Sequence, residues 1–237
     1  MIRYSSLIAA ATLLVGMSSV ALADFDSDVA KAYAPYRVAL FKSNQKDGEA
    51  TQKAIATFQS IWKGTIVKNY KVAPPRYAGE TKWSESLQAI DDIAQKAAQT
   101  TADGDVLEAH EILEAIRNEL DDLRDRNGVR VFSSYVNDFH AAMEHALAQE
   151  VSMESWSDGV RAKLLQQVGV LGYLADDLSA HVPADLSANE EFRQLLADLI
   201  HSVDAFRTAL ESNDPASVVA AQKALKPAYA KLFVKFG

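Results

Sequence analysis

The feature that most constrains this chain is a long amphipathic stretch that returns 109 residues later. Residues 105–128, DVLEAHEILEAIRNELDDLRDRNG, carry apolar side chains at alternating spacings of three and four, which places them on one face of a helix. Asp105 stands where a helix N-cap belongs, and Gly128 supplies the left-handed residue that often ends a helix. The stretch 214–237 has the same layout. Two related long helices are therefore predicted.

The correspondence extends upstream of these two helices. At the offset of 109 residues, apolar positions match apolar positions, and both halves place a proline-containing loop between helical stripes. The matching pairs are Trp83/Phe192, Leu87/Leu196, Ile90/Leu199, Ile116/Leu225, Leu120/Tyr229 and Leu123/Leu232. Any two amphipathic helices align to some degree, but matching caps, loops and final glycines are more than periodicity requires. The prediction is an all-α protein of two tandem four-helix bundles, residues 24–128 and 135–237.

Prolines indicate where the helices are interrupted. The stretch 70–80, YKVAPPRYAGE, contains a Pro-Pro pair and is predicted to be a crossover loop, as is 181–189, HVPADLSAN. Pro35 interrupts the first helical stripe, so that helix is expected either to begin near Pro35 or to bend there. Elsewhere Gly and Pro are sparse, which favours helix.

The first 23 residues have the pattern of a secretory signal peptide. Arg3 precedes an apolar run, and Ala-Leu-Ala at 21–23 has the form of a cleavage site. A membrane anchor is the alternative, but the run is short for a membrane-spanning helix. We expect cleavage after Ala23, a mature chain that begins at Asp24 without a membrane span, and a soluble periplasmic or secreted protein.

Charge and cysteine content exclude several function classes. The net charge of −8 becomes −9 once Arg3 is removed, the wrong sign for binding nucleic acid or anionic lipid. The absence of Cys excludes disulfides, thiol catalysis, Fe–S clusters and the C-x-x-C-H attachment of haem. The sequence also lacks G-x-S-x-G, a phosphate-binding loop and H-E-x-x-H. Binding is therefore expected, and catalysis is not.

Two His/Glu pairs are the candidate metal ligands. His110 and Glu114 are one helical turn apart, as are His140 and Glu144. Each pair presents an imidazole and a carboxylate on one helix face, as a divalent metal site requires. The alternative is that each His is a half-exposed residue at the edge of the apolar stripe, hydrogen-bonded to its own Glu.

Helix geometry argues against joining the two pairs in one site. If their helices fold back antiparallel, His110 lies ~27 Å from the turn and His140 ~10 Å from it, at ~1.5 Å per residue. The two imidazoles would then be separated by ~17 Å. Arg117 and Asp121 are expected opposite His140 instead, as an ion-pair cluster. A metal at either pair would take its remaining ligands from other helices or from water.

A non-covalent haem is the other ligand considered for a bundle of this kind. Met143 lies on the apolar stripe, with His140 and Met153 nearby, and His or Met are the axial ligands that haem needs. A core methionine that fills a gap is the alternative. The leader, the four-helix units and the closing helix AAQKALKPAYAKLF resemble the periplasmic cytochrome b562 and cytochrome c′ group, without the C-x-x-C-H motif of cytochrome c′. The resemblance implies a bundle fold and transfers no ligand residue.

These observations lead to two expectations about function. The first is an exported helical-bundle protein that binds a protein partner or a small ligand, as an accessory or carrier protein and not an enzyme. The second is a periplasmic bundle that binds a divalent metal or haem, for iron or copper handling or for electron transfer.

Overall fold

The computed structural model describes residues 24–237, which are folded almost entirely into α-helices. The helices are α1 (Phe25–Asn44), α2 (Gly48–Ile61), α3 (Trp83–Ala102), α4 (Val106–Arg126), α5 (Phe132–Leu147), α6 (Asp158–Ala180), α7 (Ala184–Ser187), α8 (Glu190–Ser212) and α9 (Pro215–Phe236). A π-helical turn, Trp62–Val67, continues α2, and a 3-10 turn, Pro75–Tyr77, lies in the loop that follows. No β-strand occurs in residues 24–237, and the predicted all-α class is confirmed. The predicted signal peptide lies outside the described residues.

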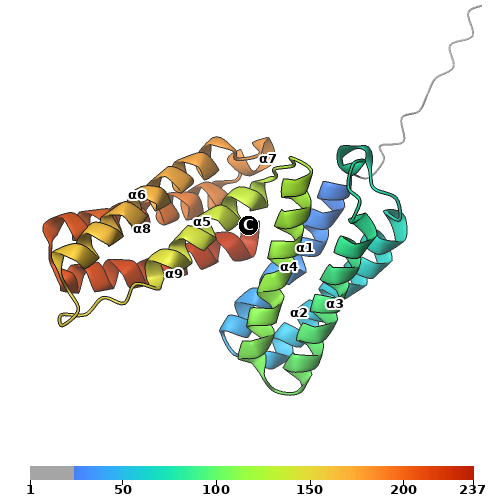
Figure 1. The fold of residues 1–237 in the computed structure, drawn as a ribbon, viewed down its shortest axis with the longest axis horizontal. Coiled ribbons are helices and arrows are strands. Elements are labelled where there is room, and N and C mark those ends of the chain that lie inside the picture. Colours follow the sequence, from blue (N-terminus) through green and yellow to red (C-terminus); the bar gives the residue numbers. More distant parts are fainter. Residues whose placement is uncertain (1–23) are drawn as a thin grey trace, which may run out of the picture.

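The helices pack as two groups (Figure 1). In the first helix group, α1 packs on α2 and α4, and α3 packs on the same two helices. In the second helix group, α5 packs on α6 and α9, and α8 packs on the same two. The long axes of the two groups are inclined to each other (Figure 1). The internal repeat and the domain boundaries derived from it remain predictions.

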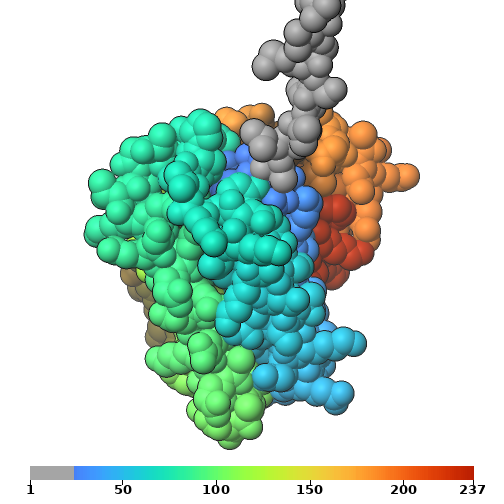
Figure 2. All heavy atoms as spheres, turned by 90° about the vertical axis from the view of Figure 1, so that its right-hand side faces the viewer, coloured from blue at the N-terminus to red at the C-terminus, as the bar shows by residue number. Residues whose placement is uncertain are grey.

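The two helix groups meet along α1 and α9. Their buried apolar side chains form one continuous cluster. The guanidinium of Arg37 on α1 donates hydrogen bonds to the carbonyl oxygens of Gly237 and, at 3.0 Å, of Lys235. Figure 2 shows the C-terminal end of the chain, in red, against the blue surface of α1. The groups are thus connected by buried apolar surface and by hydrogen bonds, in addition to the short segment between α4 and α5.

The ends of the two predicted long helices follow from their capping residues. The Asp105 carboxylate accepts a hydrogen bond from the backbone N–H of Glu108 at 3.0 Å, which satisfies one free donor of the first turn of α4. Gly128 follows α4 with φ of 62°, the left-handed conformation that glycine adopts without strain. Asp214 caps α9 in the same way as Asp105 caps α4. The apolar stripe of α4 is buried at Ala109, Leu113, Ile116, Leu120 and Leu123.

Pro35 does not begin or end a helix, because α1 runs through it. The residues before it, Val29 and Tyr33, and those after it, Tyr36 and Leu40, are all buried. Burial along the whole length of α1 outweighs the one backbone hydrogen bond that proline removes. Among residues 24–237, no helix has the length and apolar character needed to cross a membrane.

Candidate ligand-binding cleft

A cleft of about 700 Å³ opens where the two helix groups meet. Its walls come from α1 and α4 of the first group and from α5 and α9 of the second. Sites for small organic ligands commonly have ~300–1,000 Å³ and often lie between helices or at junctions between structural units. Apolar side chains and ionisable groups both line this cleft.

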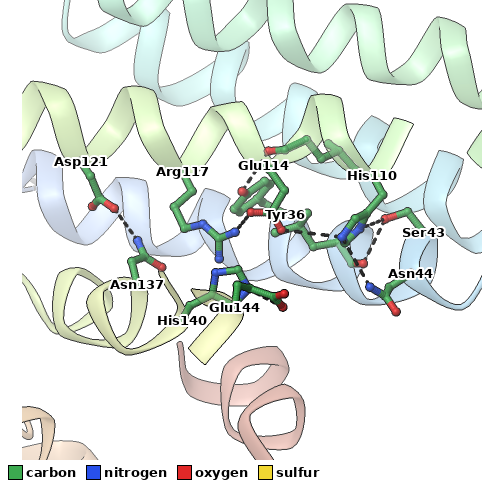
Figure 3. Close-up of polar contacts among 12 residues, drawn as sticks. Tyr36, Ser43, Asn44, His110, Glu114, Arg117, Asp121, Asn137, His140 and Glu144 are labelled. Carbon is green, nitrogen blue, oxygen red and sulfur yellow. Dashed lines mark hydrogen bonds and ion pairs between the residues drawn. The ribbon is translucent and has the colours of Figure 1, made fainter. Parts of the chain in front are cut away.

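Both predicted His/Glu pairs line this one cleft. His110 and Glu114 reach it from α4, and His140 and Glu144 reach it from α5. In Figure 3, His140 lies opposite Arg117, and His110 lies farther along α4 beside α1. The geometry of α4 and α5 alone predicted that the two His/Glu pairs lie too far apart to share a site. Residues of α1 and α9 extend the walls of the cleft, so that one cleft reaches both pairs. Nevertheless, no group of three or more His, Asp or Glu side chains in residues 24–237 is arranged to hold a metal ion.

The imidazole of His110 is held in one tautomer by Ser43. The Ser43 hydroxyl donates its single proton to the carbonyl of Leu40 at 3.0 Å, and its oxygen lies 2.9 Å from Nδ1 of His110. With the Ser43 proton on Leu40, the tautomer that fits this contact has Nδ1 as the donor and the lone pair on Nε2. Nε2 is 3.5 Å from the Asn44 amide nitrogen and 3.7 Å from Oε1 of Glu114. Burial lowers the pKa of His110, so this ring is neutral at pH 7.

The imidazole of His140 lies against the ring of Tyr229, with 5.0 Å between the ring centroids. Neither ring nitrogen of His140 has a hydrogen bond within the described chain; the nearest carboxylate oxygen, Oε1 of Glu144, is 3.6 Å from Nε2. Burial, together with the positive charges of Arg117 and Lys226, lowers the pKa of His140 to about 3. The ring is therefore neutral and keeps one N–H donor and one acceptor available.

The two carboxylates expected to bind metal already have cationic partners. Glu114 forms an ion pair with the guanidinium of Arg117, one turn farther along α4. Glu144 lies 3.2 Å from Nζ of Lys226 on α9. Arg117 is only 4% exposed and also lies over the ring of Phe233, with 5.9 Å from its guanidinium carbon to the ring centroid. A metal ion would have to compete with these cations for both carboxylates.

Tyr229 on α9 contributes a buried hydroxyl to the cleft wall. The residue is 4% exposed, and its hydroxyl proton has no acceptor among residues 24–237, while the guanidinium of Arg117, which can only donate, lies beside the hydroxyl oxygen. Burial raises the pKa of Tyr229, so the phenol stays protonated and can donate. From the sequence, Tyr229 is predicted only as an apolar position that matches Leu120. A hydroxyl-bearing side chain at a repeat position otherwise held by leucine was the signal that could have identified it.

A smaller hollow of about 320 Å³ adjoins the cleft along α4 and α5. Arg117 and His140 line both spaces. Asp121, expected opposite His140, lines this hollow together with His140 and accepts a hydrogen bond of 2.8 Å from Nδ2 of Asn137, one turn before His140 on α5 (Figure 3). Polar side chains therefore continue along the α4–α5 junction beyond the main cleft.

The methionines considered as haem ligands do not line the cleft. Met143 on α5 is fully buried in the hydrophobic core. Met153, in the loop between α5 and α6, is 73% exposed. The structure therefore places His140 next to Tyr229 and Arg117 in a cleft that neither methionine lines.

Comparison with known proteins gives no independent assignment of function. No family model, no curated protein and no solved structure matches the chain. The resemblance to the cytochrome b562 and cytochrome c′ group remains a prediction. The argument for function rests on the chemistry of the cleft.

Proposed function

We propose that this protein is an exported binding protein that holds a small ligand in the cleft between its two helix groups, as a carrier or accessory protein and not as an enzyme. The observation that carries the proposal is the presence, in a cleft of about 700 Å³, of polar groups with unused hydrogen-bonding capacity. The Tyr229 hydroxyl is buried without an acceptor for its proton, and His140, whose nearest ion-pair contact is Glu144 at 3.6 Å from Nε2, lines the same cleft. Such groups are costly to bury unless something satisfies them.

The state of the other polar groups favours binding over catalysis. A nucleophilic hydroxyl needs a base that accepts its proton. The Ser43 hydroxyl beside His110 instead donates to the backbone carbonyl of Leu40. Glu114 and Glu144 are paired with cations, so neither is a free carboxylate base. The groups that remain available, on His140 and Tyr229, are suited to hold a ligand by hydrogen bonds.

Native mass spectrometry tests this proposal. The exported protein is incubated with the low-molecular-mass extract of the cells that produce it, re-isolated, and weighed under native and denaturing conditions. We expect extra mass in the native spectrum that disappears on denaturation. Identical masses under both conditions would contradict the proposal.

Two tryptophan substitutions on α9 locate the ligand. Ala230 lines the cleft, whereas Ala224 on the same helix is exposed and does not line it. Ala230→Trp fills part of the cleft and is expected to abolish the extra mass. Ala224→Trp is the matched control and should retain it. Loss of the ligand from both variants, or from neither, would place the binding site elsewhere.

The second candidate function is binding of a divalent metal, and the geometry of His110 favours it. The hydrogen bond to Ser43 leaves the Nε2 lone pair of His110 on the side of Glu114, and a metal-binding imidazole commonly donates its other N–H in this way. If the site binds metal, His110→Ala should lower the affinity for Cu²⁺ or Zn²⁺ at neutral pH, measured by titration calorimetry. His201→Ala, on the exposed surface of α8, is the control. Equal affinities for the wild type and both variants would remove His110 as a ligand.

A further inference from the structure

The geometry points to a carboxylate group on the ligand, held at one end of the cleft by Arg117, Tyr229 and His140. This inference rests on the proposed function and adds the chemical class of the ligand, a small monocarboxylate with an apolar body. The reasons are the hydrogen-bond donors gathered at that end, the sign of the charges acting there, and the apolar side chains beside them.

The first reason is the buried hydroxyl of Tyr229. Arg117 lies beside the Tyr229 oxygen and can only donate to it, so the hydroxyl proton has no acceptor among the described residues, and a phenol kept neutral by burial donates one hydrogen bond. The atom that satisfies it must then be an acceptor, such as a carboxylate oxygen. A buried water is the alternative occupant. Removing the hydroxyl distinguishes these two, because only a ligand contact changes the affinity for a ligand.

The second reason is the incomplete pairing of Arg117. A guanidinium carries five N–H donors in one plane, and Glu114, on the preceding turn, is the one carboxylate in ion-pair contact with Arg117 in the described chain. Arg117 lines the cleft with only 4% of its surface exposed. A second carboxylate could accept from the remaining N–H groups, an arrangement in which charge-assisted hydrogen bonds are strong.

The third reason is the electrostatic environment of His140. The cationic side chains of Arg117 and Lys226 disfavour a further positive charge on its ring. Glu144, whose Oε1 lies 3.6 Å from Nε2 of His140, is itself paired with Lys226. A neutral imidazole in such surroundings can donate its N–H to an anion. An anionic ligand is therefore favoured at this end of the cleft and a cation is disfavoured.

Charge balance favours one negative charge on the ligand over two. The cleft is lined by three cationic side chains, Arg117, Lys223 and Lys226, and by three carboxylates, Glu111, Glu114 and Glu144. A monoanion needs only N–H donors such as those of Arg117 beyond its pair with Glu114. A phosphate group carries nearly two negative charges at pH 7. A lining of zero net charge does not offset them.

The apolar part of the lining indicates the rest of the ligand. Leu40, Pro227, Ala230 and Phe233 line the cleft along α1 and α9. Burial of aliphatic groups against such side chains is favourable and does not depend on direction. A short aliphatic chain attached to the carboxylate would cover this surface.

Titration calorimetry with three probes tests the inference on the full mature chain at pH 7. The probes are hexanoate, hexanamide and hexyl phosphate, which share one apolar chain and differ in the head group. We expect saturable binding of hexanoate at one site, with hexanamide and hexyl phosphate each bound at least ~10-fold more weakly, as expected when a charge-assisted hydrogen bond is lost or a charge is uncompensated. No binding of hexanoate, or equal or tighter binding of either other probe, would overturn the carboxylate assignment.

Tyr229→Phe tests the position of the carboxylate without removing volume from the core. The variant is expected to bind hexanoate ~10-fold more weakly, with an unchanged or slightly higher melting temperature, because it removes a buried hydroxyl whose proton has no protein acceptor. Tyr173→Phe, at a residue that is 68% exposed on α6, is the control and should bind as the wild type does. Unchanged affinity in Tyr229→Phe would overturn the role of this hydroxyl and indicate a bound water instead.

The NMR signals of the His140 ring give a second readout. Hexanoate should shift the ring ¹⁵N signals of His140 and leave those of the exposed His201 unchanged. No shift at His140 would place the carboxylate elsewhere. If native mass spectrometry detects a retained ligand while hexanoate does not bind, the carboxylate assignment fails and the proposed binding function stands.

Discussion

The Asn137 side chain on α5 donates a hydrogen bond of 2.8 Å to Oδ2 of Asp121 on α4. This bond connects the two helix groups, yet it satisfies only one of the two carboxylate oxygens. Oδ1 of Asp121 is buried without a hydrogen bond in the described chain. Burial raises the pKa of Asp121 to about 6, although Asn137 and the charges of Arg124 and Arg117 act in the opposite direction. Ionisation of this residue at neutral pH therefore opposes folding.

Replacement of Asp121 by Asn should stabilise the protein at neutral pH. Because the folded pKa is raised to about 6, the folded state binds more protons than the unfolded state between that pH and the usual aspartate pKa of ~3.9. The stabilisation that comes from this extra proton is complete below the pKa of Asp121 in the unfolded state. It is lost as the pH rises through the pKa of Asp121 in the folded state. We expect Asp121→Asn to raise the free energy of unfolding at pH 7 by on the order of 1–2 kcal/mol, and by less at pH 4.

Urea denaturation of the wild type and the variant at both pH values provides the measurement. Asp204→Asn, at an exposed position on α8, serves as the control and should change neither value. A variant less stable than the wild type at pH 7 would show that the charge of Asp121 stabilises the α4–α5 junction.

Replacement of His140 by Gln should reduce the loss of unfolding free energy that occurs as the pH falls. The folded pKa of about 3 lies below the usual histidine value of ~6.5, so between these values the unfolded state binds the extra proton. Protonation of His140 in the unfolded state therefore lowers the unfolding free energy of the wild type as the pH falls from ~6.5 towards ~3. The contribution of this residue is up to ~1.4 kcal/mol per pH unit. We expect the slope of unfolding free energy against pH to be smaller in His140→Gln, and unchanged in the exposed control His201→Gln. Parallel curves for all three proteins would contradict the burial of His140 as a neutral ring.

The exported protein should begin at Asp24. This residue is the N-cap of α1, and its backbone carbonyl accepts from the N–H of Asp28 at 3.0 Å. Cleavage after Ala23 would thus leave α1 complete. Intact-mass measurement of the protein recovered after export should give the mass of residues 24–237, and a mass that includes residues 1–23 would show that the predicted cleavage does not occur.

Residues 24–128 and 135–237, expressed separately, should both be helical by far-ultraviolet circular dichroism. Residues 24–128 contain α1 to α4, and residues 135–237 contain the second helix group except for the first three residues of α5. Separation exposes the apolar surface where α1 meets α9, so both fragments are expected to melt below the intact protein. Two fragments without helical signal would mean that the hydrophobic core folds only as one unit.

The helices could be predicted from local sequence because their signals are local. The Asp105 cap, the buried stripe from Ala109 to Leu123 and the glycine at 128 all act within one helix, and all three have the expected place in the structure. Local signals failed where tertiary packing determines the outcome. The alternative in which the first helix begins near Pro35 is wrong, whereas a bend there stays a prediction, and the predicted loop 181–189 contains the short helix α7.

The cleft was only partly accessible from sequence because it depends on contacts between distant helices. Spacing within one helix identified His110 with Glu114 and His140 with Glu144. It did not show that α9 would place Lys226 against Glu144 or Tyr229 against His140. Residues so far apart in the chain come together only through the packing of the second helix group, which no spacing rule encodes.

The walls of the cleft come from both helix groups, and this has a consequence for how the protein could be controlled. A ligand that touches α4 on one side and α9 on the other binds tightly only in arrangements of the groups that keep both within reach. A partner that favours such an arrangement strengthens ligand binding, and by thermodynamic reciprocity the ligand strengthens the binding of that partner to the same degree. A partner docked on the outer surface of either group could therefore load or unload the cleft without touching the ligand.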